Sequence, residues 1–513
     1  MSFQEAIQQG YAVSGDSFML GAAMHEGKVY ADAKIQVPLR MLNRHGLVAG
    51  ATGTGKTKTL QYFSESLSNA SVPVLLMDIK GDFSGIGAAG TLNDKIQERI
   101  TQLSTTYTPA AFPIELMSLS NEPGVRLRAT VSEFGPVLIS RILGLNDTQE
   151  GVMSMVFKFC DDKQLPLLDL KDLTKVLQFM SNEGKDDVKA EYGNISPSTV
   201  GTIMRNVIAL QQQGAEMFFG EKSFEVDDLM RISDDGRGVI NIVRVTDLQD
   251  RPKMFSTFML QLLAELYGSL PEAGDLDRPK LILILDEAHL IFNEASSVLL
   301  QQLETVIKLI RSKGVGIFFC TQNPTDIPQG ILSQLGFKIQ HALRAFTAKD
   351  RQDIKKVAEN YPETTFYQVD ELITQLGIGE ALVTMLNEKG IPTPLAHTMI
   401  CPPSSRMGVL EQAELSTAVS SSKLAAKYNQ VVDSESAYEI LTAKLQQAAG
   451  EQVEESTVSA KGKKATEEKS TLESILDNPV AKQVGRTAAS VLTRTLLGAL
   501  GLGGRSKKKT GWF

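Results

Sequence analysis

The sequence predicts an α/β fold in which a mostly parallel sheet is interrupted by a helical insertion and preceded by a short N-terminal β region. Short apolar runs of strand length alternate with longer amphipathic segments along much of the 513 residues. Two of these runs, residues 72–79 and 281–285, are almost entirely apolar, as in strands buried on both faces of a parallel sheet. Residues 115–235 show helical periodicity instead, broken by turn signals.

The order of the elements indicates how the core is divided. Residues 1–45 are expected to form a small β element, with short strands at 18–20 and 28–30. A helix is expected at 56–67, and the insertion at 115–235 then separates the two parts of the core, 46–114 and 236–405. Further core elements are expected as strands at 239–245, 281–285, 315–321, 339–345 and 381–386, and as helices at 251–268 and 297–312. Within the insertion, helices are expected at 134–144, 148–160, 170–182 and 197–213.

The C-terminal region changes character twice. Residues 406–448 are expected to be helical. Residues 449–471 are rich in Glu, Lys, Ser, Thr and Ala, a composition that predicts a flexible linker. Residues 472–513 predict an amphipathic helix followed by a basic tail. This helix could dock on the protein, lie on a membrane surface or contact DNA.

Composition restricts the classes of function. The formal net charge of −8 argues against a uniformly basic surface that binds nucleic acid by charge alone, although a local basic groove or a pore made by several subunits stays open. The three cysteines, Cys160, Cys320 and Cys401, are far apart and lack metal-ligand spacing, which fits a reducing compartment. We found no signal peptide and no apolar run of membrane-spanning length, so we expect a cytoplasmic protein without an integral membrane segment.

A glycine-rich segment after the apolar run 46–49 fits the P-loop pattern of phosphate-binding proteins. Its glycines allow backbone N–H groups to turn toward phosphate oxygens, and the following helix N-terminus favours an anion. Lys56 is expected on the β- and γ-phosphates, and the Thr57 hydroxyl on Mg²⁺. We therefore predict that ATP and Mg²⁺ are bound by Gly50, Ala51, Thr52, Gly53, Thr54, Gly55, Lys56, Thr57 and Lys58.

Two adjacent carboxylates, Asp286 and Glu287, follow the apolar strand 281–285. The carboxyl ends of parallel strands face the ligand crevice, where a Mg²⁺–phosphate site accounts for both charges. Asp286 is expected to hold the metal, and Glu287 to orient and deprotonate the attacking water. The alternative is a strand that runs into a solvated acidic helix start.

Polar residues after two other strands are expected at the same edge of the sheet. Gln322 could hydrogen-bond the γ-phosphate or the attacking water, or it could simply cap a loop. Asp78 could join the metal and water network, or it could belong to a turn of solvated charges. Because negative charge develops during phosphoryl transfer, an arginine is also expected. Arg311 and Arg344 are the candidates, acting within the chain or from a neighbouring subunit, unless they are ordinary surface arginines.

The order of these motifs resembles the HerA–FtsK superfamily of ring-forming motor ATPases, most closely the HerA-like, YjgR-type proteins of bacteria. Most of residues 10–405 takes part in the resemblance, and residues 334–346 and the helical insertion are its most group-specific parts. The resemblance implies a RecA-like P-loop NTPase core, a homo-oligomer that is favoured to be a hexamer, and an arginine acting across subunits.

The same resemblance bears on the substrate. HerA relatives translocate or unwind DNA, so a DNA helicase or translocase is the first hypothesis for the function. The N-terminal β region is too short for a full HerA-type barrel, and the helical insertion lacks an obvious counterpart in the DNA pumps. An ATPase motor acting on a protein partner, as in secretion, and a nucleotide-dependent regulatory switch therefore stay open as alternatives.

Overall fold

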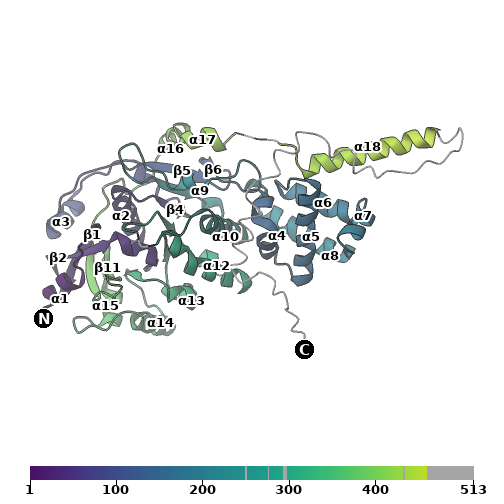
Figure 1. Ribbon diagram of the computed structural model, residues 1–513. Coiled ribbons are helices and arrows are strands. Elements are labelled where there is room, and N and C mark those ends of the chain that lie inside the picture. Colours follow the sequence, from purple (N-terminus) through teal and green to yellow (C-terminus); the bar gives the residue numbers. More distant parts are fainter. Residues whose placement is uncertain (249–250, 275, 293–296, 431, 433, 459–513) are drawn as a thin grey trace, which may run out of the picture. The chain divides into compact units, whose positions relative to one another are not determined.

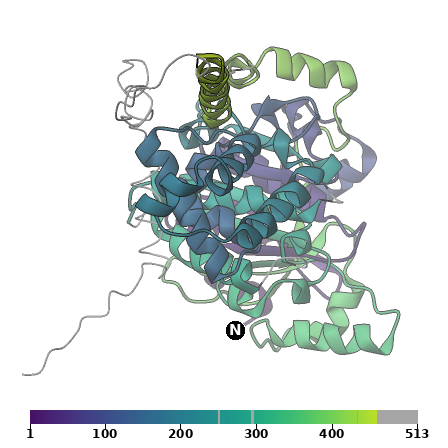
Figure 2. The same cartoon turned by 90° about the vertical axis from the view of Figure 1, so that its right-hand side faces the viewer.

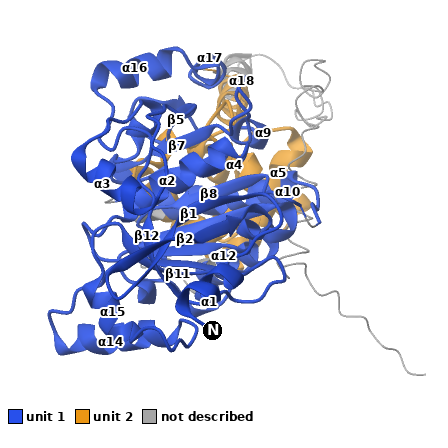
Figure 3. Ribbon diagram, turned by 90° about the vertical axis from the view of Figure 1, so that its left-hand side faces the viewer, with its two compact units in different colours: residues 1–127, 224–430 blue, residues 128–223, 431–513 orange. Residues whose placement is uncertain are grey.

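The computed structural model describes residues 1–248, 251–274, 276–292, 297–430, 432 and 434–458. They form two compact units, coloured separately in Figure 3. Unit 1 comprises residues 1–127 and 224–430, and unit 2 comprises residues 128–223 with the C-terminal part of the chain from residue 431.

Unit 1 is built on one sheet of 12 strands (Figure 1). Along the chain the strands are β1 (Ser17–His25), β2 (Lys28–Pro38), β3 (Gly46–Ala49), β4 (Val74–Asp78), β5 (Ile114–Ser118), β6 (Val125–Arg126), β7 (Ile240–Arg244), β8 (Leu281–Leu285), β9 (Val315–Thr321), β10 (Phe337–Gln340), β11 (Glu380–Thr384) and β12 (Ala396–Ile400). Their order in the sheet is β2-β1-β12-β11-β10-β3-β9-β8-β4-β7-β5-β6. The part from β10 to β6 is parallel, and the other four strands extend it antiparallel. The predicted α/β class with a mostly parallel sheet is confirmed.

Helices connect and cover these strands, because parallel neighbours need crossover connections. The helices of unit 1 are α1 (Phe3–Gly10), α2 (Lys56–Asn69), α3 (Asp94–Gln102), α9 (Val226–Leu229), α10 (Pro252–Ser269), α11 (His289–Phe292), α12 (Ser297–Ile310), α13 (Gln329–Leu332), α14 (Ala348–Glu359), α15 (Val369–Gln375), α16 (Gln412–Ser420) and α17 (Lys423–Tyr428). No described helix is long and apolar enough to cross a membrane.

The core lies where α2 packs on the central strands. Every residue of β3, β4, β8 and β9 is buried, which explains why these runs are apolar in the sequence. The Phe63 ring of α2 lies 4.8 Å from the Phe318 ring of β9, and Phe318 lies 5.7 Å from Phe337 of β10. Burying each such side chain stabilises the fold by roughly 1.5–3 kcal/mol. This packing fixes α2, and therefore the loop before it, against the sheet.

The N-terminal region differs from the small separate β element that the sequence suggested. It begins with α1, where the Ser2 and Glu5 side chains form a reciprocal capping box. β1 then pairs with β12, so β1 and β2 belong to the same sheet as the core. Gly21 allows this approach, since a Cβ there would lie 2.1 Å from the Met399 carbonyl oxygen.

Unit 2 is helical in its described part (Figures 1 and 2). Its helices are α4 (Val131–Ile142), α5 (Asp147–Lys163), α6 (Leu170–Ser181), α7 (Lys185–Glu191), α8 (Pro197–Gln212) and α18 (Ala437–Val458). The four helices expected in the insertion correspond to α4, α5, α6 and α8. Gly135, at φ 66°, kinks α4 ahead of Pro136.

Two domain boundaries in the structure differ from those expected from the sequence. The expected insertion, 115–235, takes in most of β5 and all of β6, whereas both strands belong to the sheet of unit 1. These strands were missed because they are short and contain charged residues, Glu115 and Arg126. α18 continues to Val458, into the stretch predicted as a linker. The helix and basic tail predicted at 472–513 lie outside the described residues.

Candidate nucleotide-binding site

The glycine-rich loop joins the carboxyl end of β3 to the N-terminus of α2. Gly50, Gly53 and Gly55 have φ values of 152°, 78° and 112°, which residues with side chains rarely adopt. A Cβ on Gly50 would lie 2.5 Å from the His341 Cβ, and one on Gly55 would lie 2.9 Å from the Gly379 nitrogen. The glycines therefore serve both the turn and the close packing beneath it.

Backbone contacts from two neighbouring segments hold the loop. The Ala51 N–H donates to the Ala342 oxygen at 2.8 Å, and the Gly379 N–H donates to the Thr54 oxygen at 3.0 Å. Arg99 of α3 in turn donates Nη1 to the Gly379 oxygen at 3.0 Å. The loop is thus fixed from the segment after β10 and from the turn before β11.

His341 is fully buried beneath the loop. Its Nδ1 lies 2.8 Å from the Glu380 oxygen, and its Nε2 lies 3.0 Å from the Thr59 hydroxyl. Burial lowers the pKa of His341 to about 4. The neutral ring therefore bridges α2 to β11, with Nδ1–H donating and Nε2 accepting.

Lys56, the first residue of α2, is 7% exposed. Its Nζ donates to the Gly50 oxygen at 2.6 Å and to the Ala51 oxygen at 3.1 Å. Burial lowers its pKa, and the nearby carboxylates of Glu287 and Asp286 oppose that effect. A buried ammonium among loop carbonyls and next to a carboxylate pair is suited to exchange these contacts for phosphate oxygens.

The two residues that follow Lys56 point to different surroundings. Thr57 is half-buried in the first turn of α2, the position from which a hydroxyl can ligate Mg²⁺. Lys58, which stays a prediction for nucleotide binding, donates Nζ to the Met407 oxygen and, at 3.1 Å, to Gln61 Oε1. Lys58 thus ties α2 to the segment that precedes α16.

The acidic pair lies at the same edge of the sheet as the loop. β9 separates β3 from β8, all three strands are parallel, and the register pairs Ala49 with Thr321 and Leu285 with Phe319. Asp286 and Glu287 directly follow β8 and are each 4% exposed. Burial, and then repulsion from Glu287, raises the pKa of Asp286. A cation at this edge would relieve that repulsion.

Glu287 is held by neighbours from two other strands. Its Oε1 pairs with Lys80, which follows β4, and lies 3.5 Å from Nε2 of Gln322, which follows β9. Its Oε2 lies 3.1 Å from His289 Nδ1 but makes no hydrogen bond to a described residue. Glu287 also has a φ of 47°, an uncommon backbone conformation that recurs at functional sites. Three side chains, from the ends of β4, β8 and β9, therefore meet around one carboxylate.

Asp78 lies at this edge but serves the turn that follows β4. Its Oδ1 accepts the N–H groups of Gly81 at 2.8 Å and Asp82 at 3.0 Å, and its Oδ2 accepts that of Phe83 at 3.2 Å. Burial raises its pKa to about 7 despite these bonds. The contacts favour the turn interpretation, and the turn in turn positions Lys80.

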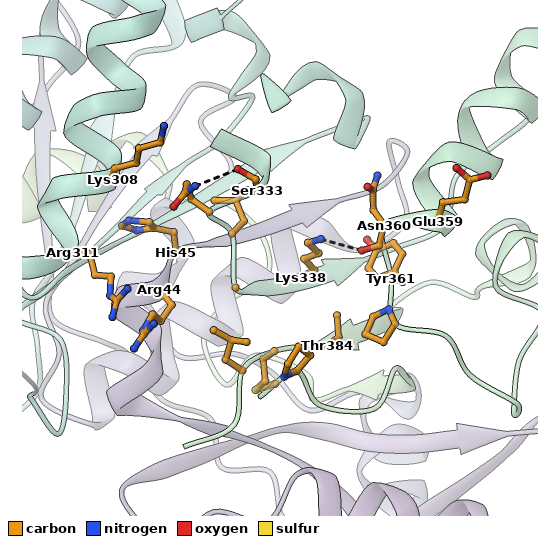
Figure 4. A pocket seen from close by; sticks show the side chains of 17 residues that line it. Arg44, His45, Lys308, Arg311, Ser333, Lys338, Glu359, Asn360, Tyr361 and Thr384 are labelled. Atoms are coloured by element: carbon orange, nitrogen blue, oxygen red, sulfur yellow. Dashed lines mark hydrogen bonds between the residues drawn. The ribbon is translucent and has the colours of Figure 1, made fainter. Parts of the chain in front are cut away.

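The two candidate arginines lie at opposite edges of the sheet. Arg344 follows β10, next to the segment that bonds the loop, and its exposed side chain donates Nη1 to the Thr374 oxygen at 3.0 Å. Arg311 precedes β9 and therefore lies at the amino edge, away from the P-loop of its own chain. There it lines a cavity of about 560 Å³ with Arg44, Lys308 and Lys338 (Figure 4).

From the sequence alone, no role at the site was assigned to four residues, Lys80, His289, His341 and Arg99. Lys80 and His289 stand within two residues of motif positions, so their place at the strand ends was a usable signal. His341 and Arg99 act on the loop from residues about 290 and 45 positions away in the chain, and pattern alone does not reveal such contacts. The structure thus adds the groups that hold the loop and Glu287 in place.

The residues at this edge fit a nucleotide with Mg²⁺. The described residues contain no group of three or more His, Cys, Asp or Glu side chains arranged as a metal cage. Mg²⁺ is usually held by one or two carboxylates together with substrate phosphates, so Asp286 and Thr57 supply the kind of partial site it uses. Of the two Glu287 oxygens, Oε1 pairs with Lys80 and Oε2 lies 3.1 Å from His289 Nδ1.

The family follows from comparison with known proteins. A family model described as "Helicase HerA-like C-terminal" matches residues 24–508. The chain belongs to this family. The HerA–FtsK membership expected from the motifs is therefore confirmed, whereas the finer resemblance to YjgR-type proteins stays a prediction.

The curated relatives of this HerA-like chain have low sequence identity to it. The DNA double-strand break repair helicase HerA of Sulfurisphaera tokodaii is 22% identical over 365 residues, which cover 69% of this chain and 64% of that protein. The DNA import protein CedB of Sulfolobus acidocaldarius is 23% identical over 392 residues, covering 76% of this chain and 57% of that protein. The chain thus spans less than two thirds of the length of these relatives.

Two solved structures are also similar. The bacterial conjugative coupling protein TrwBΔN70 is 13% identical, with 79% of this chain and 95% of that chain covered and a TM-score of 0.49. VirB4 of Thermoanaerobacter pseudethanolicus is 14% identical, with 75% and 96% covered and a TM-score of 0.47.

Proposed function

We propose that this HerA-like protein hydrolyses ATP with Mg²⁺ and works as a ring motor that translocates or unwinds DNA. The observation that carries the ATPase proposal is the order β3-β9-β8-β4 in the sheet. These four adjacent parallel strands end in the glycine-rich loop, Gln322, the Asp286–Glu287 pair and Lys80. A triphosphate on the loop would therefore have the acidic pair within reach across one strand.

Each residue has a distinct role in this proposal. Lys56 exchanges its bonds to the Gly50 and Ala51 oxygens for phosphate oxygens, and Thr57 and Asp286 hold the metal. Bound Mg²⁺ supplies Lewis-acid polarisation of the phosphate oxygens. Glu287 accepts the proton of the attacking water through Oε2, the oxygen that Lys80 does not hold. Gln322 orients that water or the γ-phosphate.

The proposal of a ring of subunits is supported by the positions of the P-loop and Arg311 at opposite edges of the sheet. The loop lies at the carboxyl edge of the sheet and Arg311 at the amino edge. A head-to-tail contact between subunits joins unlike edges and closes into a ring when the rotation allows. Arg311, beside Arg44 and Lys308, would then meet the nucleotide of the next subunit (Figure 4). We favour a hexamer, and Arg344 is the alternative arginine.

DNA as the substrate is supported by the relatives, which are named as a DNA repair helicase and a DNA import protein. The three free, buried cysteines fit a reducing compartment, and we propose a cytoplasmic location.

The test is ATP hydrolysis by the purified full chain, with and without Mg²⁺ and with duplex or single-stranded DNA at low salt. We expect Mg²⁺-dependent hydrolysis that DNA stimulates and that both Lys56→Ala and Asp286→Ala abolish. No Mg²⁺-dependent hydrolysis by the wild type would refute the ATPase proposal, and hydrolysis that either variant retains would refute the role given to that residue. Wild-type hydrolysis that neither form of DNA changes would refute the DNA proposal and leave a protein substrate or a regulatory switch.

A further inference from the structure

Phe346 is an aromatic side chain that the fold leaves in solvent. It is 87% exposed and lies in the loop between β10 and α14. The backbone there is fixed, because Asp350 Oδ2 accepts the N–H groups of Phe346 at 2.9 Å and Thr347 at 2.8 Å. Asp350 N–H donates to the Thr347 hydroxyl at 3.1 Å, which completes a capping box. A ring presented from a fixed loop pays little ordering entropy on binding.

Exposed cations follow Phe346 in the sequence, along helix α14. Ile354 and Val357 are buried and define the inward side, which leaves Lys349, Arg351, Lys355 and Lys356 exposed. Figure 3 shows α14 beside α15 at the periphery of unit 1. The outward side of α14 is therefore basic in a chain whose formal net charge is −8.

The acidic residues of α14 offset part of this positive charge. Asp350 accepts neutral N–H groups in the capping box and keeps its negative charge, and Asp353 pairs with Lys356 at 3.7 Å. The remaining carboxylate, Glu359, lies ten residues beyond Lys349, or about 15 Å along the helix. Lys349 and Arg351 lie on the two flanks of the first turn of α14, and Arg344 is exposed on the loop itself. With the one carboxylate of Asp350, this end of the helix and its loop carry a net positive charge.

We propose that Arg344, Phe346, Lys349 and Arg351 form a binding surface for a nucleic acid strand. The three cations would contact backbone phosphates, and the Phe346 ring would stack on a base. This combination of a basic track and an aromatic platform is how proteins hold single strands without reading their sequence. The inference rests on the proposed DNA motor, because it names the surface by which that motor grips its substrate.

The chemistry indicates which form of nucleic acid binds best. Stacking on Phe346 needs the face of an unpaired base, which a closed duplex conceals. We therefore expect single-stranded or locally opened DNA to bind more tightly than a closed duplex of the same length. Each phosphate contact also adds to the salt dependence of binding, so removing a cation should lower the slope of log affinity against log salt by about 1.

The experiment measures fluorescence anisotropy of labelled oligothymidine with the full chain over a range of salt concentrations. The variants are Phe346→Ala and the double variant Lys349→Ala, Arg351→Ala. Matched controls are Ile391→Ala, an exposed apolar residue outside this surface, and the double variant Lys34→Ala, Lys95→Ala. Thermal unfolding and native mass are recorded for every protein.

We expect Phe346→Ala to weaken binding at least about fivefold and the double variant to lower the salt slope by about 1 to 2. The control variants should bind as the wild type does. Wild-type affinity and slope in the test variants, or no binding of oligothymidine by the wild type, would overturn the proposal. A changed native mass of Phe346→Ala with unchanged binding would assign the surface to contacts between subunits instead. Wild-type ATP hydrolysis without DNA tests the proposed function separately.

Discussion

At the scale of single residues, the glycine-rich loop depends on positions where any side chain would be obstructed. Gly55 combines a φ of 112° with a neighbour, Gly379, whose nitrogen would lie 2.9 Å from a Cβ. Gly236 has a comparable φ of 84°, but a Cβ added to Gly236 would have no other atom within 4 Å. Comparing these two glycines therefore separates the cost of backbone strain from that of crowding at the loop.

We predict that Gly55→Ala lowers ATP affinity at least about tenfold, because relieving the clash displaces the loop that binds phosphate. Gly236→Ala should cost roughly 1–2 kcal/mol of stability from its backbone alone and leave ATP affinity unchanged. Isothermal titration with ATP and thermal unfolding of both variants test this. Equal ATP affinities in the two variants would contradict the role given to the Gly55–Gly379 approach.

At the scale of elements, His45 links the entry of β3 to its neighbours. Its Nδ1 accepts the Ile317 N–H of β9 at 3.0 Å, so its Nε2–H donates to the Ile307 oxygen of α12 at 2.8 Å. Burial lowers the pKa of His45 to about 4, and Arg311 adds to the effect. Protonation would place a second donor against the Ile317 N–H and break this link.

The lowered pKa of His45 means that acidification reduces the stability of the fold. Between pH 6.5 and 4 the unfolded chain binds a proton at His45 that the folded chain does not, so the stabilisation from the neutral ring is complete above pH 6.5 and is lost as the pH falls toward 4. The loss attributable to His45 is on the order of 3 kcal/mol. We predict that His45→Asn is less stable at pH 7.5 but loses less stability on acidification. Chemical unfolding at several pH values would contradict this if both proteins lost the same amount.

The elements also show what sequence can and cannot predict. β4, β8 and β9 were located within one or two residues, because each is an apolar run buried on both faces. β5 and β12 are no shorter than β4 and β8 but were missed, since each carries polar residues such as Glu115 and His397 inside the strand. The antiparallel joining of β1 to the sheet depends on pairing with β12, about 375 residues away, and no local pattern predicts such a pairing.

In the candidate site, too, the features with a local sequence pattern were predicted and those that depend on long-range contacts were not. The glycine-rich loop and the Asp286–Glu287 pair were recognised because the chemistry of phosphate and metal restricts residue type and spacing. The contact between Lys80 and Glu287 was not, since it depends on β4 lying next to β8 in the sheet. The position of Arg311 also needed the fold, which shows that strand β9 carries it to the edge opposite the P-loop.

At the scale of the whole molecule, the separation of Arg311 from its own P-loop makes a prediction about mixtures. If Arg311 completes the site of a neighbouring subunit, an Arg311→Ala chain retains its own loop but disables the next one. Adding this variant to wild type should lower total ATPase activity below the value expected from simple dilution. Arg344→Ala is the matched comparison, and native mass confirms that mixed rings form. Activity that falls only in proportion to dilution would contradict action across subunits.

The account depends on Glu287 serving as the base beside a nucleotide that the loop binds independently. The most direct measurement compares Glu287→Gln with the wild type in both ATP affinity and turnover. Because the amide keeps the size of the side chain but cannot accept the proton, we predict a loss of turnover of at least about a hundredfold with ATP affinity within about threefold of wild type. Turnover near the wild-type rate, or failure to bind ATP, would contradict the account.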